Sequence, residues 1–173
     1  HNKEPLNKRL FKQEKPIVPG AWRTDAYLPL IKARQVGVVV NHTSLIDGTH
    51  LIDTLLLHHV PVQKIFTPEH GFEGTADAGE DIGHSTYKDT GIPVISLFGS
   101  QKKPTPEQMQ GLDILLYDIQ DVGVRFYTYI STMHYAMEAC AENNVKFMIL
   151  DRPNPNGDYI AGPVLDTTRF KSF

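Results

Sequence analysis

The stretch VGVVV at residues 36–40 is uniformly apolar and rich in β-branched side chains. A run with no polar side chain on either face is typical of a strand buried on both sides of a parallel sheet. Four more strand-like stretches follow, at residues 63–67, 93–98, 112–117 and 145–150, each mainly apolar with a few polar positions. The segments between them predict helices at residues 49–59 and 128–143, and a short helix that opens at residues 104–107. Strands that alternate with helices predict right-handed βαβ units, and so a doubly wound α/β fold with a mainly parallel sheet.

The composition fits a globular domain. The chain has 173 residues, of which 40% are hydrophobic and 21% charged, and a domain of this size can bury about 70% of its unfolded surface. The net charge of -3 gives no electrostatic case for a nucleic-acid partner. The basic run within residues 1–15 is better interpreted as a solvated arm than as a binding patch.

Cysteine content and hydropathy further limit the classes of protein to which the chain can belong. Cys140 is the only cysteine, so an intrachain disulfide and a cysteine-based metal site are both excluded. It lies in a helix-like run, which predicts a buried structural thiol. No apolar run approaches the roughly 18 residues of a membrane span, and no signal peptide is visible. The chain fits the cytoplasm, or a periplasmic or secreted protein whose signal peptide has been removed.

Polar clusters follow several of the apolar runs directly. Asn41-His42-Thr43 follows the first run, and Glu69-His70 lies in the segment FTPEHGFEG at residues 66–74. Two further clusters occupy residues 118–129 and 151–156. The carboxyl ends of parallel strands meet at one edge of the sheet, which is where α/β proteins bind ligands. This repetition makes an enzyme the leading interpretation.

Glu69 is the first candidate for catalysis. It stands between a proline that fixes φ and the flexible Gly71, close in sequence to Phe66 and Phe72. Partial desolvation raises the pKa of a carboxyl group and suits it to general acid catalysis. The alternative is that Glu69 caps a turn or pairs with His70.

The segment after the fourth run offers a second carboxylate and a binding surface. Asp118 or Asp121 could complete a glycosidase-like pair with Glu69, while helix capping is an equal alternative for Asp121. Arg125 beside Tyr127 offers a bidentate grip on a carboxylate or phosphate, next to an aromatic surface. An ion pair between Arg125 and Asp121 is equally compatible with the pattern.

The remaining candidates come from the first and last runs. Asp151, Arg152 and Asn154 lie in a proline-stiffened loop, where an internal Asp151–Arg152 pair is the structural alternative. Asn41 and His42 are expected to line the same cleft, although a single histidine is more often structural.

A metal-dependent hydrolase is the serious competitor. Oxygen and nitrogen ligand types are present at several strand ends, namely His42, Glu69, His70, Asp118 and Asp151. No compact motif such as HExxH accompanies them, and we expect no cofactor. GxGxxG, P-loop and GxSxG motifs are also missing, which counts against dehydrogenases, NTPases and serine hydrolases. A non-catalytic sugar-binding module is the rival from a different class.

Four motifs together give a resemblance to a known family. They are PEHGFEG (68–74), GIPVISLFG (91–99), DIQDVGVRFYTYIST (118–132) and LDRPNPNG (150–157). In this order they resemble the NamZ-type exo-β-N-acetylmuramidases, a family long catalogued as a domain of unknown function. The resemblance implies a Rossmann-like N-terminal domain and a smaller C-terminal domain, with the site in the cleft between them.

The resemblance also implies an activity and a set of roles. Members remove N-acetylmuramic acid from the non-reducing ends of peptidoglycan fragments during cell-wall recycling, and many are exported. By carry-over Glu69 is the catalytic carboxylate, and a muramic acid sugar or disaccharide is the binding partner. The implied cleft residues are His70, Asp118, Gln120, Arg125, Tyr127, Arg152 and Asn154.

The resemblance further implies a division of the chain. We expect an arm and short helix at residues 1–33, the Rossmann-like catalytic domain at residues 34–166, and a connection to the C-terminal domain at residues 167–173. Family members are roughly twice as long, so the second domain is expected to be missing from this chain.

Overall fold

A computed structural model of the chain describes residues 16–68 and 85–170. Six strands form one sheet in the order β5-β6-β4-β1-β7-β8. All neighbours are parallel except β5 and β6, which pair antiparallel at one edge. The strands are β1 (Val36–Val40), β4 (Val62–Thr67), β5 (Ser85–Tyr87), β6 (Ile92–Ser96), β7 (Ile114–Asp118) and β8 (Lys146–Ile149). The α/β fold with a mainly parallel sheet is thus confirmed.

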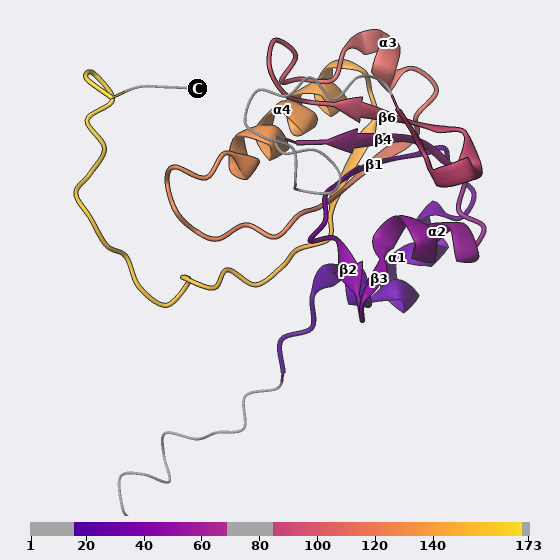
Figure 1. Cartoon of the computed structure of the whole chain (residues 1–173), viewed down its shortest axis with the longest axis horizontal. Coiled ribbons are helices and arrows are strands. Elements are labelled where there is room, and N and C mark those ends of the chain that lie inside the picture. The colour runs from indigo at the N-terminus through magenta and orange to yellow at the C-terminus, as the bar shows by residue number, and fades with distance from the viewer. Residues whose placement is uncertain (1–15, 69–84, 171–173) are drawn as a thin grey trace, which may run out of the picture.

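Helices cover both faces of the sheet (Figure 1). One face carries α1 (Thr24–Ile31) and α2 (Leu51–Leu57), and the other carries α3 (Pro106–Met109) and α4 (Tyr129–Glu142). The expected helix at residues 49–59 begins later, because residues 45–50 form a small hairpin of β2 (Leu45–Ile46) and β3 (Thr49–His50). Within residues 16–68 and 85–170 there are also two 3-10 turns, η2 (Gly20–Trp22) and η3 (Lys88–Thr90). None of the described helices is long and apolar enough to cross a bilayer.

Alternation along the strands divides the core into two clusters. Val36, Val38 and Val40 face the cluster beneath α1 and α2, whereas Val39 faces the one beneath α3 and α4. Each cluster draws on alternate residues because successive strand side chains point to opposite faces. Cys140 is buried in the α4 cluster, where burial raises its pKa to about 12, as expected for a structural thiol.

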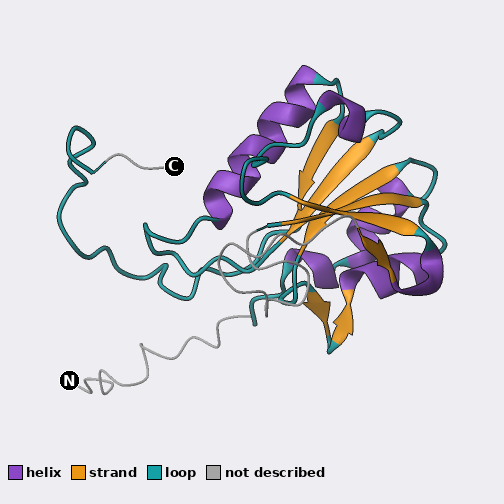
Figure 2. Cartoon of the chain, turned by 45° about the horizontal axis from the view of Figure 1, so that its top comes forward, coloured by secondary structure: helices purple, strands orange, loops and turns teal. Residues whose placement is uncertain are grey.

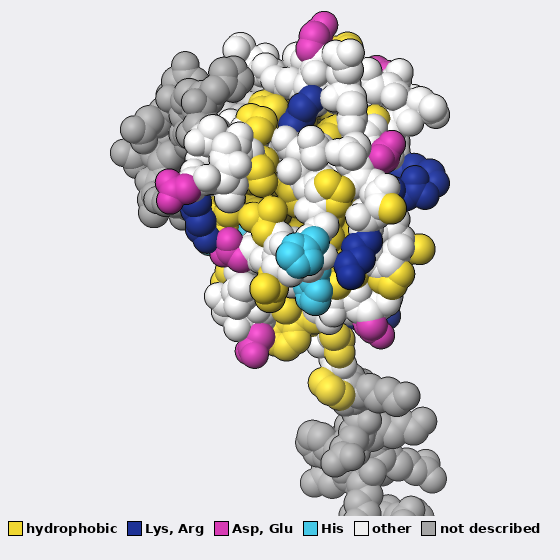
Figure 3. All heavy atoms as spheres, turned by 90° about the vertical axis from the view of Figure 1, so that its right-hand side faces the viewer, with side chains coloured by type: hydrophobic (Ala, Val, Ile, Leu, Met, Phe, Trp, Pro, Cys, Tyr) yellow, Lys and Arg dark blue, Asp and Glu magenta, His cyan; other side chains and the backbone are white. Residues whose placement is uncertain are grey.

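The two ends of the sheet differ in character. The strands begin at the right of Figure 1, and Figure 3 shows that side, where acidic, basic and apolar side chains are mixed and neither sign of charge dominates. At the other end the chain leaves β7 and β8 in long connections, and residues 150–170 contain no helix or strand (Figure 2). The polar segments of the sequence are therefore concentrated at the carboxyl ends of the strands.

Candidate active site

The site lies at the switch point of the sheet. From β1 the chain moves to β4 on one side, and it later returns to β7 on the other. Val40 and Asp118 are paired at the carboxyl ends of β1 and β7. A doubly wound sheet leaves a crevice at such a point because the connections on the two sides run in opposite directions. The prediction that Asn41 and Asp118 share one sheet edge is confirmed.

A turn at residues 41–44 ties these two strand ends together. Asn41 Oδ1 accepts hydrogen bonds from the Thr43 backbone N–H at 2.9 Å and from Thr43 Oγ1 at 2.6 Å. Thr43 Oγ1 in turn accepts from the Gln120 backbone N–H at 3.0 Å. Ser44 Oγ accepts from the Asn41 backbone N–H at 3.1 Å and donates to the Asp118 carbonyl. These bonds fix the backbone on both sides of the crevice.

The amide nitrogen of Asn41 is buried without a partner. Because the Thr43 N–H can only donate, the side-chain atom that it contacts must be the amide oxygen, which assigns Nδ2 without ambiguity. Nδ2 then has no acceptor among the described residues, although Asn41 is fully buried. A buried polar group without a hydrogen bond is uncommon and costs about 1–3 kcal/mol. The Asn41 side chain therefore fixes the turn through its amide oxygen and leaves Nδ2 enclosed.

His50 supports Asn41 through a hydrogen bond to the Asn41 backbone carbonyl. Its Nδ1 accepts from the Ile52 backbone N–H at 3.2 Å, which caps α2, so Nε2 carries the proton and donates to the Asn41 carbonyl at 3.0 Å. Burial lowers the pKa of His50, and the neutral ring suits both contacts. The sequence predicted only a helix at His50, and its capping role was missed because histidine is not among the preferred N-cap residues.

Asp118 and Arg152 form a buried ion pair. Arg152 Nε donates to Asp118 Oδ1 at 2.5 Å, and its Nη2 donates to Oδ2 at 2.9 Å and to the Leu45 carbonyl at 3.1 Å. The Asp118 side chain is 0% exposed and that of Arg152 is 9% exposed. Burial raises the pKa of the Asp118 carboxyl, and the Arg152 guanidinium opposes that shift. Arg152 therefore pairs with a residue of the neighbouring strand and not with the adjacent Asp151.

The loops after β7 and β8 contact each other above this pair. Gln120 Nε2 donates to the Pro153 carbonyl at 2.8 Å. Asp121 Oδ1 accepts from the Gly123 backbone N–H at 2.7 Å in a tight turn, so the expected helix-capping alternative is wrong. Gly123 has a φ of 69°, and a Cβ there would clash with the Asn154 side chain, so glycine is needed on both grounds.

Two hollows lie along these loops and hold five of the predicted residues. Asp121, Asp151, Arg152 and Asn154 contribute to a hollow of about 310 Å³ that also has Tyr117, Ile119 and Met133 in its wall. Arg125 and Asn154 contribute to a hollow of about 560 Å³, and Arg125 Nη1 also donates to the Pro163 carbonyl. Asn154 links the two hollows.

The other predicted residues lie outside those walls. Tyr127 is half-buried and packs edge-on against Tyr129, with 4.8 Å between ring centroids. His42 is exposed. Glu69 and His70 fall outside the described residues, and β4 ends nearby at Thr67 on the same sheet edge. Their roles stay predictions.

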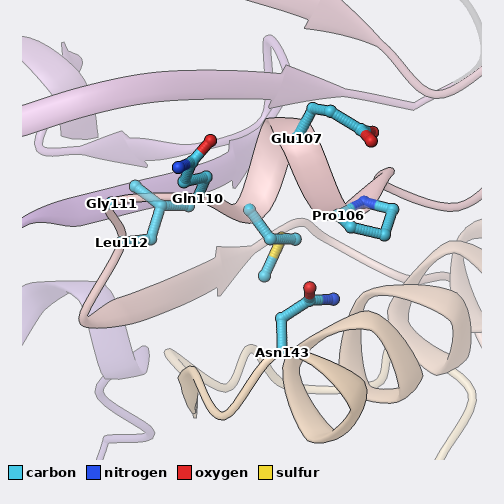
Figure 4. Close-up of a pocket in the computed structure, with 7 residues that line it drawn as sticks. Pro106, Glu107, Gln110, Gly111, Leu112 and Asn143 are labelled. Atoms are coloured by element: carbon cyan, nitrogen blue, oxygen red, sulfur yellow. The ribbon is translucent and has the colours of Figure 1, made fainter.

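A metal centre and a hollow at the opposite end of the sheet have weaker support as functional sites. No group of three or more histidine, cysteine or acidic side chains suited to a metal occurs among residues 16–68 and 85–170. A further hollow of about 460 Å³ lies between the ends of α3 and α4, with Glu107 as its one charged residue (Figure 4). It lies away from the switch point, and we assign no site to it.

The fold and the candidate site define a doubly wound α/β domain in which polar residues gather at the switch point of the sheet. The chain belongs to the family described as exo-beta-N-acetylmuramidase NamZ, N-terminal, whose model matches residues 36–173. This membership confirms the resemblance carried by the four sequence motifs.

Individual relatives agree with that assignment. The chain is 46% identical over 143 residues to the peptidoglycan beta-N-acetylmuramidase NamZ of Bacillus subtilis (strain 168), a match that covers 81% of this chain and 34% of the relative. Crystal structures of two DUF1343 family proteins from Bacteroides fragilis superpose with TM-scores of 0.76 and 0.75, at 44% and 40% identity. They cover 89% and 87% of this chain, and 40% and 38% of their own chains are matched. The chain thus spans about a third of the length of its curated relative.

Proposed function

We propose that this chain forms the Rossmann-like part of an exo-acting β-N-acetylmuramidase. Such a glycoside hydrolase releases N-acetylmuramic acid from the non-reducing ends of peptidoglycan fragments. The observation that carries the proposal is the 46% identity to a relative named for this activity. The gathering of polar residues at the switch point supports it, because a sugar substrate needs several fixed hydrogen-bond partners.

The chemistry assigns different roles to the acidic residues. Glu69 acts as the general acid that protonates the leaving oxygen. Asp121 is the better candidate for the second carboxylate, which stabilises positive charge or activates water, because it contributes to the 310 Å³ hollow. Asp118 has both oxygens bound to Arg152 and is fully buried, so its geometry favours anchoring that guanidinium.

The muramic acid sugar carries a lactyl carboxylate that an arginine can bind. Arg125 is exposed at the edge of the larger hollow, and its contact with the Pro163 carbonyl leaves other guanidinium donors available. Charge-assisted bonds from guanidinium to carboxylate are among the stronger hydrogen bonds in proteins. Asn154 and Tyr127 supply further polar and aromatic contacts to the sugar.

A second domain would complete the cleft. Apolar side chains in the segment after β8 are highly exposed, with Ile160 at 97% and Val164 at 93%. Contiguous exposed apolar side chains usually mark a surface that another element covers. We propose that the C-terminal domain of the parent enzyme covers these residues and contributes the other wall of the site.

The test is release of N-acetylmuramic acid from a β-linked chromogenic muramide. The product of the whole gene, the 173-residue chain and the Glu69→Gln variant of the whole product are compared. Replacing Glu69 by Gln should cost orders of magnitude in rate, because it removes the acidic proton and keeps the shape. Glu107→Gln, which makes the same change in exposed α3, is the matched control and should retain full activity.

The outcomes separate the proposal from its rivals. Full activity of Glu69→Gln would refute the assignment of the general acid. Loss of activity in a chelator would favour the metal-dependent hydrolase, whereas thermal stabilisation by muramic acid without turnover would favour a binding module.

The substrate also bears on where the protein acts. Peptidoglycan lies outside the cytoplasmic membrane, so the proposal places this enzyme of cell-wall recycling in the periplasm or outside the cell. Recovery of activity only from spheroplast contents, and not from the periplasm or medium, would contradict that placement.

A further inference from the structure

The 3-10 turn η2 lies directly against the loop that carries Arg152. The Gly20 backbone N–H donates to the Asp151 carbonyl at 2.6 Å. A Cβ at Gly20 would lie 2.6 Å from the Asp151 nitrogen and 2.7 Å from the Leu150 carbonyl carbon, which no real Cβ tolerates. The close approach of the two backbones therefore requires glycine at this position.

The same turn reaches Arg152 through a shared acceptor. The Trp22 indole Nε1 donates to the Leu45 carbonyl at 3.2 Å, and Arg152 Nη2 donates to the same oxygen at 3.1 Å. A carbonyl oxygen has two lone pairs, so it can accept both donors at once. The indole thus fixes the oxygen that holds one side of the guanidinium, while Asp118 holds the other.

The turn is itself held rigidly by the core. Ala21 is fully buried in the cluster beneath α1 and α2, and the Tyr27 hydroxyl donates to the Ala21 carbonyl at 2.9 Å. Burial, together with the nearby Asp118 charge, raises the pKa of Tyr27 to about 12, so the hydroxyl keeps its proton at neutral pH. This segment precedes residue 36, where the match to the family model begins.

Part of the Arg152 guanidinium remains available. Its hydrogen bonds use Nε and Nη2, and no described residue accepts from Nη1. Arg152 also contributes to the wall of the 310 Å³ hollow. A guanidinium held on two sides presents its third nitrogen in a fixed direction, which favours binding of an oxygen acceptor.

We infer that the turn Gly20–Trp22 is a positioning element of the active site, which orients Arg152 so that Nη1 meets an oxygen of the bound substrate. Its effect on catalysis rests on the muramidase function proposed above, whereas its effect on Arg152 does not. Trp22 and Gly20 act through Arg152 and touch no reacting atom.

The test uses the whole gene product with Trp22→Phe, which removes the indole N–H and keeps most of the ring. Selective 15N labelling of arginine allows exchange of the Arg152 Nε–H with water to be followed by NMR, a readout that does not depend on activity. The lost bond is the one from the indole to the Leu45 carbonyl, which also accepts from Arg152 Nη2. Its loss should loosen the guanidinium, speed exchange of the Nε–H about five- to tenfold and lower kcat/KM by a similar factor. The melting temperature should change little, because the indole is 45% exposed.

The control is Asn143→Ala, which removes a side-chain bond of 2.8 Å to the Ala139 carbonyl at the far end of α4. It should leave both the exchange of Arg152 and kcat/KM unchanged. If Gly20→Ala folds, it should speed exchange of the Arg152 Nε–H and lower kcat/KM more than Trp22→Phe does. If it does not fold, Trp22→Phe alone decides whether the turn positions Arg152.

Each outcome bears on one part of the inference. Unchanged exchange of the Arg152 Nε–H in Trp22→Phe would overturn it. Faster exchange with the kcat/KM of the control would overturn the catalytic part. If the wild-type protein releases no muramic acid, the proposed function fails, while the exchange rates still decide whether the turn positions Arg152.

Discussion

Replacing Arg152 by methionine should destabilise the domain strongly, because it leaves the Asp118 carboxylate buried without its counter-charge. Asp118 is 0% exposed and both of its oxygens bind the guanidinium, at 2.5 and 2.9 Å. Removing one partner of such a buried pair costs about 3–5 kcal/mol. A domain of this kind is stable by about 5–15 kcal/mol in total, so the variant would lose a large share of its free energy of unfolding.

The loss of stability in Arg152→Met should depend on pH in a defined direction. Burial already raises the pKa of Asp118, and loss of Arg152 removes the effect that opposes this rise. A carboxyl whose folded pKa lies above its unfolded value binds its proton more tightly in the folded state. The destabilisation is therefore smallest when pH is below the unfolded value of about 3.9, and it grows as pH rises through the folded pKa.

Urea unfolding followed by the fluorescence of Trp22, the single tryptophan, measures the effect. With an m-value of about 2 kcal/mol per M, the midpoint at pH 7 should fall by about 2 M, and by less near pH 4.5. Lys103→Met breaks the exposed bridges to Glu138 and Glu142 and should barely move the midpoint. A shift in Arg152→Met no larger than this control, or equal deficits at the two pH values, would refute the reasoning.

Two further substitutions probe the supports of the site. Burial lowers the pKa of His50 in the folded chain. As pH drops, the unfolded chain therefore takes up a proton at this histidine before the folded chain does, and the free energy of unfolding should fall as pH drops through about 6.5. His50→Gln should flatten this dependence between pH 7 and about pH 5, and an unaltered profile in thermal melts would assign it to another group. Gly37→Ala places a Cβ 2.8 Å from the side-chain ends of Leu112 and Leu115 and should cost about 1–3 kcal/mol in urea unfolding. Wild-type stability of that variant would show that the two leucines move aside freely.

Much of the sheet could be predicted because buried parallel strands have a strong sequence signal. Residues 36–40 were expected as a strand and form β1 at those positions. The hairpin of β2 and β3 was missed, since strands of two residues are too short to show alternation, although Asp47-Gly48 between them is a typical hairpin turn. β5 was missed for a similar reason, because it contains only three residues.

The candidate site could be predicted from the sequence less completely than the sheet. Sheet polarity was enough to bring Asn41 and Asp118 to one edge, because both directly follow apolar runs. The partner of Arg152 could not be predicted, since sequence adjacency points to Asp151 whereas the bond spans 34 positions to Asp118. The role of Trp22 was equally hidden, because its acceptor is a backbone carbonyl and leaves no side-chain signature.

The enclosed nitrogen of Asn41 has a consequence for the stability of the domain. Thr43 fixes the orientation of the Asn41 amide, so Nδ2 cannot turn toward another acceptor without breaking the bonds to Oδ1. A buried donor without a partner among the described residues costs about 1–3 kcal/mol, and that cost falls on folding and not on any later step. The turn that joins the ends of β1 and β7 therefore sacrifices part of the free energy of unfolding to hold the backbone at the switch point in one conformation.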